Sequence, residues 1–446
     1  MSKIYELTLF QKIVKKYVIG TFTRFYGEYI VNGRENIPVS GPVIFAPNHV
    51  NALMDALAVL SFTPDSYATV YLSRSDLFKK KIIAKILNFF KLMPAFRIRD
   101  GFENLGKNAE TFDKCVELLD KNQTLCLMPE GNQELEHKIR PLVKGIFRIA
   151  FQTQEKVGQE RPVKIIPVGV NIEHLVKYGK KIIVNIGKPI DVSEYMSLYN
   201  ENQAVAINKI KAKLHADLCE LTLNLATDKY YECFYTASEV ASTEMMKKSS
   251  LENNTNGRFI ARQKVSKILI EKEKNEETKI EKLNVLCEDY SRFLTKYKLR
   301  TSNIETGTEP VLLTAAKIIL LISVFPVFLV GFLLNALPFL TPVFIRKKLK
   351  IKFEGFFSSV QYGVAILVTF PLFYLIQTLL FAFISGSELW LVALFVPFQY
   401  IIGKFSFIWY KLFKSVLAEL RLKKITQSGE IKQIQSLYQQ IIQLIF

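Results

Sequence analysis

The sequence has few of the residues that most often bind metals or form disulfides. Its 446 residues include only four histidines and five cysteines. The cysteines are odd in number and widely spaced, and they form neither a CxxC pair nor a cluster with histidine. We therefore expect neither a disulfide scaffold nor a metal site. The sequence also lacks HExxH and GxSxG motifs, which argues against a zinc protease and an α/β-hydrolase.

The N-terminus lacks the uninterrupted apolar run of a secretory signal peptide, because Lys12, Lys15 and Lys16 break every candidate. We therefore expect the body of the chain to stay in the cytoplasm. Residues 1–35 mix apolar with basic side chains, which is typical of an amphipathic helix on a membrane surface. A helix packed on the following domain is the alternative.

The chain is basic and rich in apolar residues. It has 59 Lys and Arg against 41 Asp and Glu, a formal net charge of +18. A hydrophobic fraction of 49% with 22% charged residues excludes general disorder. The basic residues are dispersed and accompany apolar stretches, so we expect a partner surface of anionic lipid rather than nucleic acid.

Long uncharged runs occur in residues 311–446, which predicts a membrane region with a basic C-terminal tail. Residues 318–344 and 362–386 contain no charge, and residues 389–409 contain only Lys404. Each run exceeds the length of about 18 residues that indicates a membrane segment, provided that Lys404 faces protein or extends to the surface.

Basic clusters predict how these runs are oriented. Residues 346–352 and 411–424 are rich in Lys and Arg, so both clusters should be cytoplasmic. Residues 362–386 and 389–409 then form a transmembrane hairpin. The run 318–344 is too short to cross twice at about 20 residues per crossing, so we expect a re-entrant or interfacial helical hairpin there. Its expected breaks are Pro326, Asn335, Pro338 and Pro342.

Short apolar runs alternate with helical patterns between residues 36 and 200, which predicts an α/β domain. The expected strands are 43–46, 69–72, 124–128, 164–170 and 181–186, and the expected helices are 54–60, 79–90, 108–120 and 144–153. Residues 201–305 are highly charged and follow helical spacing, which indicates a helical extension.

His49 and Asp55 are the first candidates for catalysis. His49 follows the expected strand 43–46, and Asp55 lies near the start of the next expected helix. A neutral imidazole accepts a proton from an alcohol, and a carboxylate on its other nitrogen fixes the tautomer and stabilises the imidazolium. The spacing also allows a helix-capping histidine with a first-turn carboxylate, and both interpretations stay open from spacing alone.

A second candidate element follows the strand 124–128. Pro129 and Gly131 enclose Glu130, which predicts a tight turn that presents the carboxylate at the sheet edge, although an ordinary turn would look the same. Basic side chains occur nearby in the sequence and match phosphate oxygens, although some of them face solvent or headgroups. They are Arg97, Arg99, Lys138, Arg140, Lys144 and Arg148.

The order of these motifs resembles the four sequence blocks of the glycerolipid (lysophospholipid) acyltransferase superfamily. The blocks are His49-x5-Asp55, Arg99, Pro129-Glu130-Gly131 and Ile165-Ile-Pro167-Val-Gly169. The resemblance covers roughly residues 35–195 and implies an acyltransferase-type mixed sheet flanked by helices. It also implies transfer of an acyl group from acyl-CoA or acyl carrier protein to a glycerol hydroxyl, without a metal or bound cofactor.

The resemblance also assigns roles by position. His49 is implied to be the general base and Asp55 its orienting partner. Arg99, Glu130 and Gly131 are implied to contact the phosphorylated acceptor, together with Arg140 and Lys144. Pro167 is implied to shape the acyl-donor side.

The sequence after Glu130 is similar to the branch with glycerol-3-phosphate and dihydroxyacetone-phosphate acyltransferases of fungi and related bacterial proteins. We therefore expect a membrane-bound acyltransferase of phospholipid synthesis, with glycerol 3-phosphate as acceptor and its catalytic domain on the cytoplasmic face. A lysophosphatidate or other lysophospholipid acyltransferase is the enzymatic alternative, and a basic membrane scaffold the non-enzymatic one. Two departures matter: five residues separate His49 from Asp55 where many members have four, and Asn132-Gln133-Glu134 replaces Thr-Arg-Ser.

Overall fold

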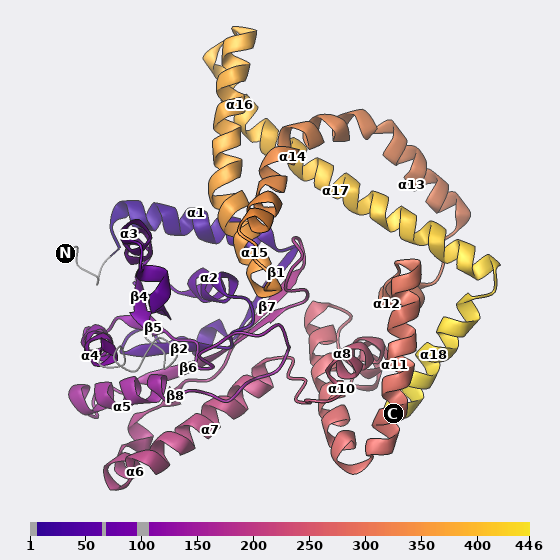
Figure 1. The fold of residues 1–446 in the computed structure, drawn as a ribbon. Coiled ribbons are helices and arrows are strands. Elements are labelled where there is room, and N and C mark those ends of the chain that lie inside the picture. Colours follow the sequence, from indigo (N-terminus) through magenta and orange to yellow (C-terminus); the bar gives the residue numbers. More distant parts are fainter. Residues whose placement is uncertain (1–6, 65–67, 96–106) are drawn as a thin grey trace. The chain divides into compact units, whose positions relative to one another are not determined.

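The computed structural model describes residues 7–64, 68–95 and 107–446. The chain divides into two compact units. The first comprises residues 1–224 together with 351–362, and the second comprises residues 225–350 together with 363–446. Figure 1 shows the sheet in the first unit, whereas the second consists of helices.

The first unit is built on one eight-stranded sheet. The strand order is β1-β7-β6-β2-β5-β3-β4, and β8 pairs with β6 off this path. Neighbouring strands are parallel except for the pairs of β6 with β7 and with β8. The strands are β1 (Glu28–Asn32), β2 (Val43–Pro47), β3 (Val70–Arg74), β4 (Leu92–Ala95), β5 (Thr124–Cys126), β6 (Lys164–Ile172), β7 (Lys181–Ile186) and β8 (Ile190–Asp191).

The predicted α/β class with a mixed sheet is confirmed. All five predicted strands form, as β2, β3, β5, β6 and β7. The four predicted helices also form, and they are α2 (Leu53–Phe62), α3 (Lys81–Phe89), α4 (Lys107–Asp120) and α5 (Gly145–Val157). The helix expected in residues 1–35 is shorter: α1 spans Leu9–Phe25, and residues 28–32 form the edge strand β1 beside β7.

Neighbouring side chains of β2 pack against helices on opposite faces of the sheet. Ile44 belongs to the core shared with α4, α5 and α7 (Gln203–Leu221). Phe45 points to the opposite face, since successive strand residues alternate, and its ring contacts Phe62 of α2. The apolar face of α7 completes the first layer, so the first unit extends to residue 224 rather than to the expected boundary at 200.

A short segment from late in the chain also belongs to the first unit. Residues 351–362 contain α15 (Phe357–Val360) and end at Tyr362, which is fully buried. The Tyr362 hydroxyl donates to the carbonyl of Val18 at 2.8 Å, and its ring contacts Phe22 and Phe25. This segment is the beginning of a helical stretch that continues beyond residue 362 as a π-helical segment (Gln361–Thr369) and α16 (Phe370–Ser385).

The second unit begins with the predicted charged helices and ends with apolar ones. The charged part contains α8 (Tyr231–Val240), α9 (Ser242–Lys248), α10 (Thr255–Asn275), α11 (Glu277–Tyr297) and α12 (Thr301–Thr306). The rest contains α13 (Val311–Ser323), α14 (Phe325–Lys348), α16, α17 (Leu389–Gln427) and α18 (Ile431–Ile445). Among the residues that the structure describes, three helical stretches are long and apolar enough to cross a membrane: Phe325–Lys348, Glu354–Ser385 and Leu389–Gln427.

The run 318–344 is divided between the end of α13 and α14, and α14 continues through three of the four expected breaks. Only Pro326 lies at a helix start, whereas Pro338 and Pro342 lie inside α14. A proline leaves the carbonyl four residues earlier without its helical donor. Here Gln377 donates to the carbonyl of Leu334 at 2.8 Å, and Thr369 donates to that of Pro338 at 3.0 Å. Side chains of the neighbouring stretch thus replace both missing donors.

Candidate functional site

The loop between β2 and α2 carries the histidine. Asn48 continues the pairing of β2 with β6 through its side chain: its Oδ1 accepts the backbone N–H of Val170 at 2.6 Å, and its Nδ2 donates to the carbonyl of Val170 at 3.1 Å. The next residue, His49, therefore leaves the sheet at a fixed position. Its side chain is 18% exposed, so the imidazole lies at the surface of the site rather than in the core.

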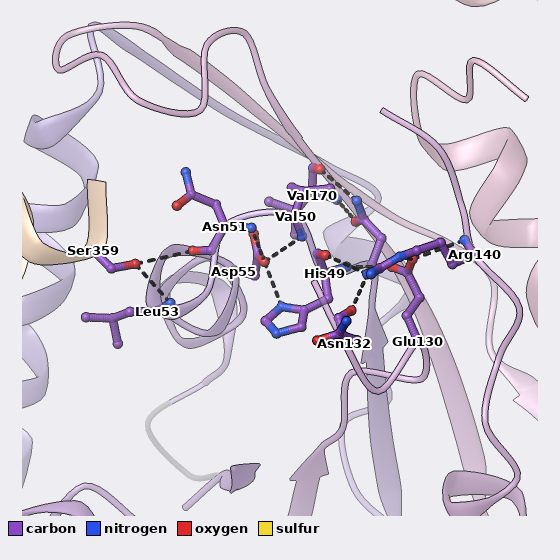
Figure 2. A network of polar contacts seen from close by, with 11 residues as sticks. His49, Val50, Asn51, Leu53, Asp55, Glu130, Asn132, Arg140, Val170 and Ser359 are labelled. Carbon is purple, nitrogen blue, oxygen red and sulfur yellow. Dashed lines mark hydrogen bonds and ion pairs between the residues drawn. The ribbon is translucent and has the colours of Figure 1, made fainter. Parts of the chain in front are cut away.

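The Asp55 carboxylate contacts the imidazole of His49. Its Oδ2 lies 2.9 Å from Nδ1 of His49 and also accepts the backbone N–H groups of Val50 and Asn51, at 2.9 and 2.7 Å (Figure 2). The Asp55 side chain is fully buried. One buried carboxylate oxygen thus contacts the imidazole and two backbone amides of the same loop. Nε2 of His49 makes no hydrogen bond to any residue within the described ranges, so it is available to a substrate.

Glu130 and Arg140 hold the backbone of His49 from both sides. Oε1 of Glu130 accepts the His49 N–H at 2.7 Å, and Nη2 of Arg140 donates to the His49 carbonyl at 3.0 Å. The two side chains form an ion pair, with Nε of Arg140 2.9 Å from Oε2 of Glu130. Arg140 also donates to the carbonyl of Asn132 (Figure 2). The Glu130 side chain is only 1% exposed, so this arrangement favours support of His49 over direct contact with an acceptor.

The turn that carries Glu130 depends on Gly131. Gly131 has a φ of +68°, in the left-handed region that favours glycine, and its N–H donates to the carbonyl of Met128 at 3.1 Å. An added Cβ would lie 3.1 Å from Cγ1 of Val143, which is tighter than ordinary packing. The predicted tight turn is therefore present, and it directs the Glu130 carboxylate toward the His49 backbone.

The remaining predicted site residues, Lys144, Pro167 and Arg99, have different environments. Lys144 is exposed at the start of α5 and forms no ion pair with the residues that the structure describes, so its charge is available. Pro167 is buried in β6 opposite Ala46, and its carbonyl accepts the N–H of Gly187 at 2.9 Å, so it belongs to the sheet. Arg99 lies outside the described residues.

The Asp55 carboxylate affects two titratable side chains, Tyr26 and Cys126. Burial raises the pKa of Tyr26, and the charge of Asp55 raises it further. The same two causes, in the same order, raise the pKa of the Cys126 thiol well above its usual value. Both groups therefore stay protonated near neutral pH. In the described part of the chain, no three His, Cys, Asp or Glu side chains are grouped as metal ligands.

Two further residues, Asn51 and Ser359, also support the loop that carries His49. Asn51 is fully buried and donates from Nδ2 to the carbonyl of Leu175 at 2.8 Å. Ser359 approaches from the segment 351–362 and contacts the backbone of Asn51 and Leu53 (Figure 2). Ser359 is more than 300 residues away from both in the chain, so local spacing could not reveal it. Asparagine directly after a histidine loop is the weaker signal that Asn51 offers.

Parts of this chain are similar to known proteins. The family model described as Acyltransferase matches residues 28–171. A chloroplast 1-acyl-sn-glycerol-3-phosphate acyltransferase of Brassica napus is 26% identical over 42% of this chain and 50% of its own. Glycerol-3-phosphate O-acyltransferase 2 of Saccharomyces cerevisiae is 23% identical over 44% of this chain and 26% of its own. The chain thus spans half or less of these two relatives.

A solved structure is also similar over part of its length. It is the 1-acyl-sn-glycerophosphate acyltransferase PlsC of Thermotoga maritima, with 19% identity and a TM-score of 0.33. The similarity covers 46% of this chain and 79% of that one.

Proposed function

From the acyltransferase-family domain in residues 28–171, we propose that this chain transfers a fatty acyl group from a thioester to a hydroxyl of glycerol 3-phosphate. The observation that carries the proposal is the contact of 2.9 Å between Nδ1 of His49 and Oδ2 of the buried Asp55. A carboxylate at Nδ1 leaves Nε2 as the nitrogen that accepts a proton. Both residues lie within the matched range.

In the proposed mechanism, Nε2 of His49 takes the proton of the acceptor hydroxyl as its oxygen attacks the thioester carbonyl. The new C–O bond forms and the C–S bond breaks, so the products are an ester and a thiolate. The thiolate leaves without strong acid assistance because a thiol has a low pKa, and it then takes the proton back from His49. Acyl-CoA or acyl carrier protein is the substrate that supplies the thioester, and the proposal includes no cofactor or metal.

The acceptor is the finer part of the proposal. The similar proteins are named for two different acceptors, 1-acylglycerol 3-phosphate in the plant relative and glycerol 3-phosphate in the yeast one. We favour glycerol 3-phosphate because the sequence after Glu130 resembles the branch that uses it. Acylation of lysophosphatidate or another lysophospholipid is the alternative.

The basic residues divide into two proposed roles. Lys144 is exposed and uncommitted, so it suits a phosphate of the acceptor, and Arg99 has the same proposed role from the family pattern. Glu130 and Arg140 are positioning residues in this proposal because their polar atoms bind each other and the His49 backbone. Gly131 supports them through the turn. Pro167 is assigned to the acyl-donor side by the resemblance alone.

The proposed location of the catalytic unit is the cytoplasmic face of a membrane. Residues 351–362 belong to the same unit as residues 1–224, so the chain must be on one side of the membrane at both residues 224 and 351. Helix α14 lies between them and is followed by a basic cluster. One crossing by α14 would put these residues on opposite sides. We therefore propose that α14 enters the bilayer or its surface without crossing, while residues 362–386 and 389–409 cross as a hairpin.

Protease protection of tags tests this topology. One tag is placed after residue 349 and another after residue 446, in sealed vesicles from cells that express the full chain. We expect both tags on the side of the catalytic unit. Tags on opposite sides would contradict the proposed topology.

Acyl transfer by the purified full chain in nanodiscs tests the activity. Radiolabelled glycerol 3-phosphate and lysophosphatidate are offered separately, each with acyl-CoA and with acyl carrier protein, and His49→Ala is the control. A labelled monoacyl product from glycerol 3-phosphate that the control does not form supports the proposal. A diacyl product from lysophosphatidate alone supports the alternative. Transfer to neither acceptor contradicts both and favours another acceptor or the scaffold.

A further inference from the structure

The segment 351–362 contacts the loop between β2 and α2 next to Ala52, which has an uncommon backbone conformation. Ala52 precedes α2 and has φ 43° and ψ −113°, a conformation that residues with a side chain rarely adopt. Ala52 provides no side-chain cap to the helix. Ala52 is one of the five residues between His49 and Asp55, and the chain bends at this residue.

Ser359 binds the backbone on both sides of Ala52. Its Oγ accepts the N–H of Leu53 at 3.2 Å and donates to the carbonyl of Asn51 at 3.5 Å (Figure 2). The first N–H groups of a helix have no partner within the helix, and a serine hydroxyl from the preceding residue normally supplies one. Ser359 does this from a distant part of the chain.

The segment itself is held in place by other contacts of the first unit. The hydroxyl of Ser358, which is buried, donates to the carbonyl of Leu175, and the same carbonyl accepts Nδ2 of Asn51. At the end of the segment, Tyr362 is buried against α1 and donates to the carbonyl of Val18. The Ser359 hydroxyl is therefore fixed at the bend between two anchored neighbours.

We infer that Ser359 is a positioning residue that holds the Asn51–Leu53 bend and thereby the contact between His49 and Asp55. Only a few residues connect the bend to Asp55. The N–H of Asn51 donates to Oδ2 of Asp55, and Leu53 is only two residues before Asp55 in the same helix. A bend that relaxes at Ala52 changes the distance from Asp55 to His49, and rates fall steeply when reacting groups are displaced. The first residues of an apolar helical stretch thus complete the catalytic loop.

Hydrogen exchange tests the contact without any assumption about the substrate. In the full chain in nanodiscs, Ser359→Ala should increase exchange at the backbone amides of residues 51–55, and Ser359→Thr, which keeps the hydroxyl, should restore protection. Glu354→Gln is the matched control, since Glu354 is exposed on the same segment. Unchanged exchange in Ser359→Ala would overturn the inference.

The kinetic test rests on the proposed function. Ser359→Ala should lower kcat about tenfold, with KM for both substrates within about twofold, because Ser359 orients the base rather than binding substrate. In an Asp55→Asn background, the same substitution should cost less than about twofold, since the pair it positions is already broken. Equal losses in both backgrounds would show a purely structural role and contradict the inference. If exchange rises but wild-type protein transfers no acyl group, the proposed function fails while the contact stands.

Discussion

The carboxylate of Glu130 accepts the backbone N–H of His49 at 2.7 Å, so the residue of the predicted turn acts on the main chain of the predicted base. The same carboxylate pairs with Arg140, which donates to the carbonyl of His49. His49 is thus held at its N–H and at its carbonyl by one ion pair. His49 therefore contacts this pair through its backbone and Asp55 through its imidazole.

The Glu130–Arg140 pair provides the first prediction. Glu130→Gln should lower kcat by about tenfold or more, because the His49 backbone loses part of its support. It should also lower the free energy of unfolding by about 2 kcal/mol, less than for a fully buried pair because Arg140 is partly exposed. Steady-state kinetics and denaturant unfolding in detergent measure the two effects.

A double variant separates the two effects. Glu130→Gln with Arg140→Met removes the unpaired charge, so it should recover part of the lost stability but none of the lost kcat. Recovery of activity in the double variant would show that the pair does not position His49.

The second prediction concerns Asp55. Asp55→Asn keeps the shape of the side chain but replaces an oxygen by an amide group, so the imidazole loses its charged partner. We expect kcat to fall about 10²-fold or more while the far-ultraviolet circular dichroism spectrum stays unchanged. A variant with more than half of the wild-type kcat would remove Asp55 from the mechanism.

The third prediction concerns the buried thiols. Burial raises the pKa of Cys115 to about 12, and burial followed by the Asp55 carboxylate raises that of Cys126 well above its usual value. Both thiols should therefore resist iodoacetamide at pH 8.5 in the folded protein and react in denaturant, as mass spectrometry can show. Cys126→Ala should keep kcat within about threefold, because the proposed transfer passes through no acyl-cysteine. Loss of activity with an intact fold would indicate such an intermediate.

These thiols also affect stability at high pH. A raised pKa in the folded state means that folding favours the neutral thiol. The stabilising contribution is complete below the unfolded pKa of about 8.5 and is lost as pH rises toward the folded value. Stability should therefore decrease above about pH 8.5, and less steeply in Cys115→Ala. A decrease of the same slope in the variant would contradict this assignment.

The strands that the sequence predicts are those of the sheet interior. Strands β2, β5 and β6 are buried on both faces, so they are continuous apolar runs. Strands β1 and β4 were not predicted, and both lie at the sheet edges. Pro94 interrupts the pattern of β4, and an edge strand tolerates a proline that an interior strand does not. Residues 28–32 of β1 follow a helix directly and show no alternation of burial.

The site was predictable where it depends on local spacing. His49 and Asp55 are six residues apart on a strand end and a helix start, and the structure brings them together. The sequence does not reveal that Glu130 and Arg140 bind the His49 backbone, because the residues involved lie on separate loops. The sequence also does not reveal the role of Ser359, because only the tertiary fold places residues 351–362 in the first unit.

The last prediction concerns a membrane-facing surface on the first unit, formed by α1 and α3. Apolar side chains of α3 are exposed, and Ile82 is 76% exposed. Phe10 of α1 contacts the ring of Phe89, and Gln11 donates to the Phe89 carbonyl at 2.7 Å, so the two helices form one surface. The exposed apolar residues of this surface are Leu9, Phe10, Ile13, Tyr17, Ile82, Ile83, Ile86 and Phe90. Lysines accompany them in both helices, as in helices that lie on anionic lipid.

Photolabelling of the full chain in nanodiscs tests this surface. With a photoactivatable anionic phospholipid, we expect label on residues 9–17 and 82–90 in addition to the three long apolar stretches. Helix α4 is the internal control, because its exposed Lys114 forms an ion pair with Glu110 one turn away and it should stay unlabelled. Ile82→Ser with Ile86→Ser should reduce the label on residues 82–90 severalfold without changing that on residues 389–409. Label confined to the long apolar stretches would show that α1 and α3 do not contact lipid.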